Sequence, residues 1–183
     1  MTTTIDSMKR PPLVDPLFVA MAVGLFVLDQ LTKGWIAATL GPGGSRQSIE
    51  IVGDFVRLVY TTNTGAAFGI GQNRSLVFTV VALVAIPAIT LFNRSVTPRS
   101  LLTRLCLGAL LGGTLGNLVD RLRLGYVVDF VDVGVGDLRW PSFNVADSSF
   151  VVGILVLSIY LFLTDPARGR EREAADRPDQ RYA

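Results

Sequence analysis

Apolar residues along this chain are concentrated in four long blocks separated by shorter polar segments. The blocks lie at about residues 16–38, 73–93, 101–121 and 147–164. A helix needs about 20 predominantly apolar residues to cross the hydrocarbon core of a bilayer, and core helices of soluble domains are usually shorter. The pattern therefore predicts a mainly α-helical membrane protein with four transmembrane helices.

A different pattern occupies about residues 45–68, between the first two blocks. Residues 49–52 and 55–60 alternate in polarity and are rich in β-branched side chains, and Gly53 and Asp54 stand between them. Such runs around a Gly-Asp pair predict a small β-hairpin. Because open sheet edges cannot face lipid tails, we expect this hairpin at the membrane surface.

The positions of lysine and arginine predict the orientation of the four spans. These residues crowd the tail at 1–12, the short loop between the second and third blocks, and the segment after the fourth, as Lys9, Arg10, Arg94, Arg99, Arg104, Arg168, Arg170 and Arg172. Cytoplasmic loops are enriched in such residues. We therefore expect residues 13–165 to form a membrane domain with both termini in the cytoplasm, followed by a disordered charged tail at 166–183. A cleaved signal peptide is an alternative for the first block, but three further spans follow it.

Composition narrows the possible chemistry. The chain has 183 residues, 17% of them charged, with no histidine and a single cysteine, Cys106. This composition excludes imidazole bases, most zinc sites, most thiol chemistry and an internal disulfide. The formal charge of +2 is too small to predict nucleic-acid binding. We expect no metal or other cofactor and no inhibition by chelators, which leaves carboxylates as the reactive groups.

Asp129 and Asp147 stand near the outer ends of apolar stretches, 18 residues apart. A carboxylate at the centre of a span costs about 2.5–3.5 kcal/mol and less toward the interface, so such acids indicate function. Two neighbouring carboxylates do not easily both ionise, and one tends to keep a proton. One acid can then take a proton from water while the other donates to a peptide carbonyl, which is acid–base hydrolysis. The alternative is that both acids cap helices, with Asp147 capping the fourth span.

Further polar residues accompany the end of the third block. Helical spacing places Gly113, Asn117, Asp120 and Arg121 along one face. This face could form a substrate groove, or it could be an ordinary packing face with an arginine reaching the interface. Small residues at positions 108, 112 and 116 permit close helix contact, and for the glycines we favour packing.

Two other segments carry polar residues that each have two interpretations. Asp29 and Lys33 are four residues apart, acid first, the favourable order for a helical ion pair. We favour an interfacial anchor for this pair, although Lys33, the only lysine beyond the N-terminal tail, leaves a serine–lysine hydrolase open. Asn63 begins a small, polar, turn-rich string at 63–69 that either lines a site or is a re-entrant loop returning to the second span.

Five strings together resemble lipoprotein signal peptidase (signal peptidase II, or prolipoprotein signal peptidase), a family of bacterial aspartic endopeptidases. They occupy residues 29–33, 63–68, 116–121, 127–130 and 143–147, in the family's order and over the part of the chain that holds the four blocks. The resemblance covers about residues 15–164.

The resemblance implies an enzyme of the bacterial cytoplasmic membrane with its active site on the extracytoplasmic side. Such enzymes act on prolipoproteins whose cysteine already carries a diacylglyceryl group. They cleave directly before that cysteine and release the signal peptide, and they work in contact with membrane lipids. Asp129 and Asp147 correspond to the catalytic pair, and residues 49–68 correspond to an extracytoplasmic β-cradle. Asn63, Asn117, Arg121 and Asn144 correspond to polar residues around the pair, and Asp29, Lys33 and Asp120 to a supporting shell. Globomycin-like cyclic peptides are the inhibitors expected to occupy the same groove.

Two other functions remain open on the residues alone. A proton- or ion-coupled transporter would use intramembrane acids as relays. A non-enzymatic membrane scaffold would use the face of Gly108, Gly112 and Gly116 to bind other helices.

Overall fold

The computed structural model describes residues 15–44, 47–65, 74–95 and 100–164. The tails at 1–12 and 166–183 lie outside the described residues, as do positions 66–69 of the string that begins at Asn63.

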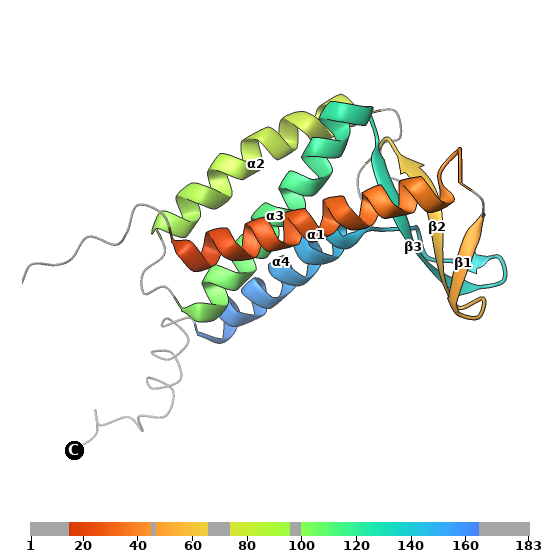
Figure 1. Ribbon diagram of the computed structural model, residues 1–183. Coiled ribbons are helices and arrows are strands. Elements are labelled where there is room, and N and C mark those ends of the chain that lie inside the picture. Colours follow the sequence, from red (N-terminus) through yellow and green to blue (C-terminus); the bar gives the residue numbers. More distant parts are fainter. Residues whose placement is uncertain (1–14, 45–46, 66–73, 96–99, 165–183) are drawn as a thin grey trace, which may run out of the picture.

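Four helices run side by side, and a small sheet lies at one end of them (Figure 1). The helices are α1 (Pro16–Leu40), α2 (Ser75–Ser95), α3 (Leu101–Leu124) and α4 (Val145–Leu163). All four are long and apolar enough to cross a membrane. The predicted fold class, four spanning helices with a small sheet, is confirmed, and the helix ends differ from the expected block ends by only a few residues.

Capping residues define several of the helix ends. The Asp15 side chain accepts hydrogen bonds from Leu17 N and Phe18 N at the start of α1, which satisfies donors that have no partner within the helix. Gly125 ends α3 with φ 82°, a left-handed conformation that glycine adopts without a steric penalty. The chain therefore leaves α3 sharply and can turn back over the end of the bundle.

Helix α3 lies at the centre of the bundle and packs against the other three helices. A Cβ atom on Gly108 would lie 2.7 Å from Phe18 O, and one on Gly112 would lie 2.6 Å from Ala22 O. These glycines therefore let α1 approach α3 at backbone distance. The packing interpretation of the glycine face is confirmed, and the contact lies inside one chain.

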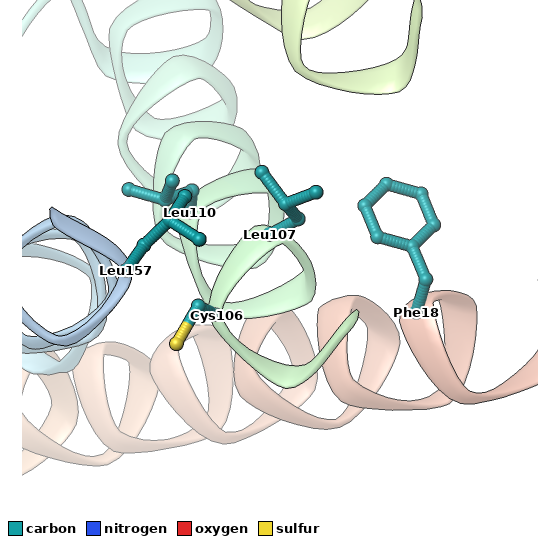
Figure 2. Packing of buried hydrophobic residues seen from close by; sticks show 5 residues of the cluster. All are labelled: Phe18, Cys106, Leu107, Leu110 and Leu157. Atoms are coloured by element: carbon teal, nitrogen blue, oxygen red, sulfur yellow. The ribbon is translucent and has the colours of Figure 1, made fainter. Parts of the chain in front are cut away.

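The apolar contacts between the helices include a buried cluster formed by Phe18, Cys106, Leu107, Leu110 and Leu157 (Figure 2). It joins α1, α3 and α4 at the end of the bundle away from the sheet. The three helices that carry the candidate site are thus fixed to one another far from the site itself.

The sheet has four antiparallel strands in the order β1 (Ser48–Val52), β2 (Val56–Asn63), β3 (Val127–Val135) and β4 (Leu138–Arg139). The predicted hairpin is confirmed as β1 and β2, with Gly53 at φ 48° in the turn. Strands β3 and β4 correct the sequence analysis, which placed Asp129 at the outer end of an apolar span. Residues 127–131 are a short, nearly continuous apolar run, and periodicity alone cannot distinguish a buried strand of this kind from a helix end.

A second buried cluster attaches the sheet to the bundle. Ile36 and Leu40, at the end of α1, pack with Val128 and Phe130 of β3. Asp129 lies between these two anchored residues, so its position on the end of the bundle is set by packing on both sides.

Candidate active site

Asp129 and Asp147 come together where the sheet meets the bundle, Asp129 on β3 and Asp147 in the first turn of α4. Asn144 connects them. Its side-chain Nδ2 donates to Asp129 Oδ1 at 2.7 Å, and its backbone N donates to Asp147 Oδ2 at 3.2 Å. Since Asn144 is 0% exposed, both carboxyl groups are held by one completely buried residue.

The start of α4 explains this arrangement. Asn144 is the N-cap, and its Oδ1 accepts a hydrogen bond from Asp147 N at 2.8 Å. Asp147 returns a bond to Asn144 N, so the two residues form a capping box. The capping interpretation of Asp147 is therefore partly correct. Asn144 is the N-cap, and Asp147 is the N3 residue whose side chain completes the capping box. The same carboxyl group of Asp147 also lies beside Asp129.

Asp129 is 2% exposed. Its Oδ2 accepts a hydrogen bond from Asn63 Nδ2 at 3.0 Å, so amide groups hold both of its oxygens. Burial is the main cause that raises the pKa of Asp129 to about 7, and the negative charge of Asp147 is the second. The two amide hydrogen bonds to Asp129 act in the opposite direction and lower its pKa. Asp129 is thus suited to keep a proton near neutral pH.

Asn117 holds the other acid from the side of α3. Its Nδ2 donates to Asp147 Oδ1 at 2.8 Å. Its Oδ1 accepts from Lys33 Nζ at 2.9 Å and from Asn144 Nδ2 at 3.2 Å. Asn117 therefore connects the acid pair to a charged cluster between α1 and α3.

That cluster consists of Asp29, Lys33 and Asp120. Lys33 Nζ lies 2.9 Å from Asp29 Oδ2 and 3.0 Å from Asp120 Oδ2, and the three residues are 0%, 4% and 4% exposed in chain order. The predicted ion pair between Asp29 and Lys33 is confirmed. Its interpretation as an interfacial anchor is wrong, because both side chains are buried between helices rather than at the surface.

The two acids of this cluster also hold the backbone that carries the candidate pair. Asp29 Oδ1 accepts from Ala146 N at 2.9 Å, directly before Asp147. Asp120 Oδ2 accepts from Val128 N at 3.2 Å, directly before Asp129. The cluster therefore sets the separation of the two segments on which the pair depends.

Sequence reasoning did not assign a role to Gln30. Its Nε2 donates to Asp120 Oδ1 at 3.1 Å and to Asp29 Oδ2 at 3.2 Å, so it completes the cluster. The available signal was its position directly after Asp29 inside a string of the family resemblance.

The geometry does not favour a serine–lysine mechanism. A lysine ammonium has three donors, and Lys33 directs its Nζ to Asp29, Asp120 and Asn117. A serine–lysine hydrolase requires this nitrogen at a serine hydroxyl instead.

Arg121 and Gly113 flank the pair in different ways. Arg121 Nη2 donates to Gly65 O at 3.0 Å, and its guanidinium lies 5.7 Å from the centre of the Phe78 ring. Within the described residues its buried Nε has no hydrogen-bond partner. Gly113 touches neither acid: a Cβ there would collide with Ala146 O, so this glycine allows α3 and α4 to approach closely.

In the described parts of the chain no three histidine, cysteine, aspartate or glutamate side chains converge to form a metal site. The fold and the site together define a multi-pass membrane protein whose paired acids, one of them buried, suit hydrolysis by activated water.

Comparison with known proteins identifies the family. The family model described as signal peptidase (SPase) II matches residues 21–163. The lipoprotein signal peptidase of Moorella thermoacetica is 42% identical over 154 residues, which cover 84% of this chain and 98% of that protein. That of Symbiobacterium thermophilum is 39% identical over 149 residues, 81% of this chain and 96% of the relative.

Two solved structures of bacterial membrane enzymes are also similar. One, determined at 2.3 Å, has a TM-score of 0.70 and 30% identity and covers 79% of this chain and 87% of its own. The other, determined at 1.9 Å, has a TM-score of 0.69 and 33% identity and covers 81% and 93%. The chain belongs to the signal peptidase II family and is accordingly a membrane protease with lipoprotein signal peptidase function. Nothing in these matches points to a transporter.

Proposed function

We propose that this chain cleaves diacylglyceryl-modified prolipoproteins directly before the lipidated cysteine, with Asp129 and Asp147 as the catalytic pair. The observation that carries the proposal is the bridge through Asn144, which holds both carboxyl groups at one buried point. A raised pKa at Asp129 supports it further, because one protonated and one ionised acid are what the reaction needs.

In the proposed mechanism the ionised acid takes a proton from a water molecule, whose oxygen attacks the carbonyl carbon of the scissile peptide bond. The protonated acid donates its proton to the carbonyl oxygen, which yields a tetrahedral diol. Proton transfer to the amide nitrogen then breaks the C–N bond and releases the signal peptide and the lipidated cysteine with a free amine. The pair titrates as a unit, so the shared proton belongs to both acids.

Polar residues around the pair have supporting roles in this proposal. Asn63, Asn117 and Asn144 orient the carboxyl groups through the hydrogen bonds that they donate. Arg121 binds the substrate backbone or a headgroup, which is supported by its Nε, for which the described residues provide no hydrogen-bond partner. Globomycin-like cyclic peptides would bind in the same place and compete with the substrate.

We further propose that the chain lies in the bacterial cell membrane with the sheet on the extracytoplasmic side and both termini in the cytoplasm. Arg94 and Arg104 support this orientation, because they lie in the last turn of α2 and the first turns of α3, at the end of the bundle away from the sheet (Figure 1).

The test is hydrolysis of a diacylglyceryl-modified prolipoprotein peptide by purified protein. Asp129→Asn and Asp147→Asn should each lower kcat by about 10³-fold or more, because the side-chain shape is kept while the acid–base function is lost. Asp132→Asn is the matched control. This aspartate lies on the same strand and is also buried, but it pairs with Arg57 and Arg139 instead of with the acid pair. Normal cleavage by either folded variant of the pair would reject the assignment.

A further inference from the structure

An apolar pocket of about 280 Å³ lies directly beside Asp147. It is lined by Trp140, Pro141, Ser142, Phe143, Asp147, Ser148, Val151 and Val152. Residues 140–143 form the segment between β4 and α4, so the pocket lies between this segment and the first turns of α4. Among the described residues that line it, Asp147 alone is charged and alone belongs to the proposed catalytic and substrate-binding set.

The pocket continues into the surface that α4 presents to lipid. Val152 is 59% exposed, and Leu155 and Ile159, which follow at intervals of three and four residues, are 55% and 58% exposed. Residues at this spacing share one face of a helix. A ligand in the pocket can therefore run from Asp147 along an apolar stripe toward the middle of the membrane.

We propose that this pocket holds an acyl chain of the diacylglyceryl group on the substrate cysteine, an inference that rests on the proposed function. The lipidated cysteine directly follows the scissile bond, so its glycerol and acyl chains must leave the site beside the catalytic pair. Asp147 lines the pocket and belongs to that pair. A peptide backbone would bring N–H and C=O groups that need hydrogen-bond partners, whereas an acyl chain needs only the apolar walls that the pocket provides.

The pocket acts by positioning rather than by affinity. An acyl chain in the bilayer is already in an apolar environment, so its transfer into the pocket gains little from the hydrophobic effect. Seating the chain instead fixes the position of the cysteine, and thereby of the scissile carbonyl, relative to the two acids. The effect of chain length is therefore expected in kcat, since the geometry of the bound substrate controls the chemical step.

The experiment compares two lipidated peptides of identical sequence in nanodiscs, one with dipalmitoyl and one with dibutyryl glycerol. The wild-type protein should cleave the dipalmitoyl peptide with a kcat at least about tenfold higher, because only the long chain fills the pocket. Val152→Trp fills the pocket from an exposed position, so the fold should be kept while the ratio of the two kcat values falls toward one. Ile154→Trp is the matched control, because Ile154 is also exposed, at 43%, on α4 but lies outside the pocket lining.

The outcomes separate this inference from the proposed function. An unchanged ratio of the two kcat values in Val152→Trp would overturn the acyl-chain proposal. If both peptides were slowed equally, the pocket would instead be assigned to a part that the two peptides share, a side chain of the signal peptide. Failure of the wild-type protein to cleave either lipidated peptide would refute the proposed function itself, on which the inference depends.

Discussion

Asn144 combines two roles that are usually given to different residues. Its side-chain oxygen caps α4, and its side-chain nitrogen donates to Asp129. The same residue therefore begins the helix that carries Asp147 and holds the acid on β3. Sequence reasoning named Asn144 through the family resemblance alone, because the 15 residues that separate it from Asp129 carry no local signal of contact.

Substitutions at Asn144 should separate these two roles. Serine caps helices about as well as asparagine, but its side chain does not provide the amide donor to Asp129. Asn144→Ser should therefore lower kcat by about 10–100-fold, in line with the loss of an orienting hydrogen bond at a reacting group. Asn144→Ala should lower kcat similarly and also reduce the free energy of unfolding by about a further 1 kcal/mol, because the cap is lost. Wild-type kcat in the serine variant would show that the bond to Asp129 has no catalytic role.

The proton on Asp129 predicts a pH dependence. With its pKa raised to about 7, Asp129 loses its proton as the pH rises through neutrality. Cleavage should then fall about tenfold per pH unit above pH 7, because the donor to the carbonyl is lost. A profile measured from pH 5 to 9 tests this, and full activity at pH 9 would contradict it.

The same shift predicts how stability changes with pH. Between the unfolded pKa of about 3.9 and the folded pKa near 7, the folded protein binds more protons at Asp129, so stability falls as the pH rises across this range. Asp129→Asn should remove this contribution from the melting temperature between pH 5 and 8. Asp132 serves as the control: its arginine partners hold its pKa below the usual range, so its contribution is lost only at more acidic pH.

At the scale of secondary-structure elements, the four helices were predictable and the second half of the sheet was not. Long apolar blocks define spanning helices by length, whereas β3 is short and pairs with β2 more than 60 residues earlier in the chain. The hairpin of β1 and β2 was predictable because its pairing is local and its turn carries Gly53.

The contact between α3 and α4 supplies a prediction about element packing. Gly113→Ala places a methyl group against Ala146 O, so α4 must move away, and Asp147 moves with it. We expect a loss of about 1–3 kcal/mol in stability, as for other overpacked sites, together with reduced kcat. Gly24→Ala is the control, since no atom lies within 4 Å of the added methyl group and alanine favours helix. Thermal unfolding in detergent and the peptide assay measure both effects; equal behaviour of the two variants would contradict the packing argument.

At the scale of the whole molecule, the described chain places its apolar surface outside and much of its polar chemistry inside. Helix α2 illustrates the first point, because only 11% of its most apolar 18-residue stretch is buried within the protein. The ion cluster of Asp29, Lys33 and Asp120 illustrates the second. This distribution is expected of a protein whose solvent is lipid, where buried charges must find partners within the bundle.

Cysteine labelling tests the proposed orientation of the whole molecule. Cys106 is buried and is the only native cysteine, so a Cys106→Ala protein is a suitable background. Leu138→Cys lies on β4 at 86% exposure, and Ser95→Cys lies at the opposite end of the bundle. A membrane-impermeant maleimide should label the first in spheroplasts and the second only after permeabilisation. The reverse pattern would invert the orientation.

The sequence by itself determined the number of spanning helices, the first hairpin, the scarcity of reactive groups other than carboxylates and, through its motifs, the candidate pair. These properties are local: they depend on composition, on apolar length, and on turn residues next to the strands that they join. Only the tertiary structure decided that Asp29 and Lys33 are buried, that one asparagine holds both acids, and that an apolar pocket lies beside Asp147. The first two of these properties join residues that are distant in the chain, and close packing of the helices and the sheet brings those residues together. The pocket is lined by residues 140–152 of one segment, and it depends on how the chain folds back onto the first turns of α4.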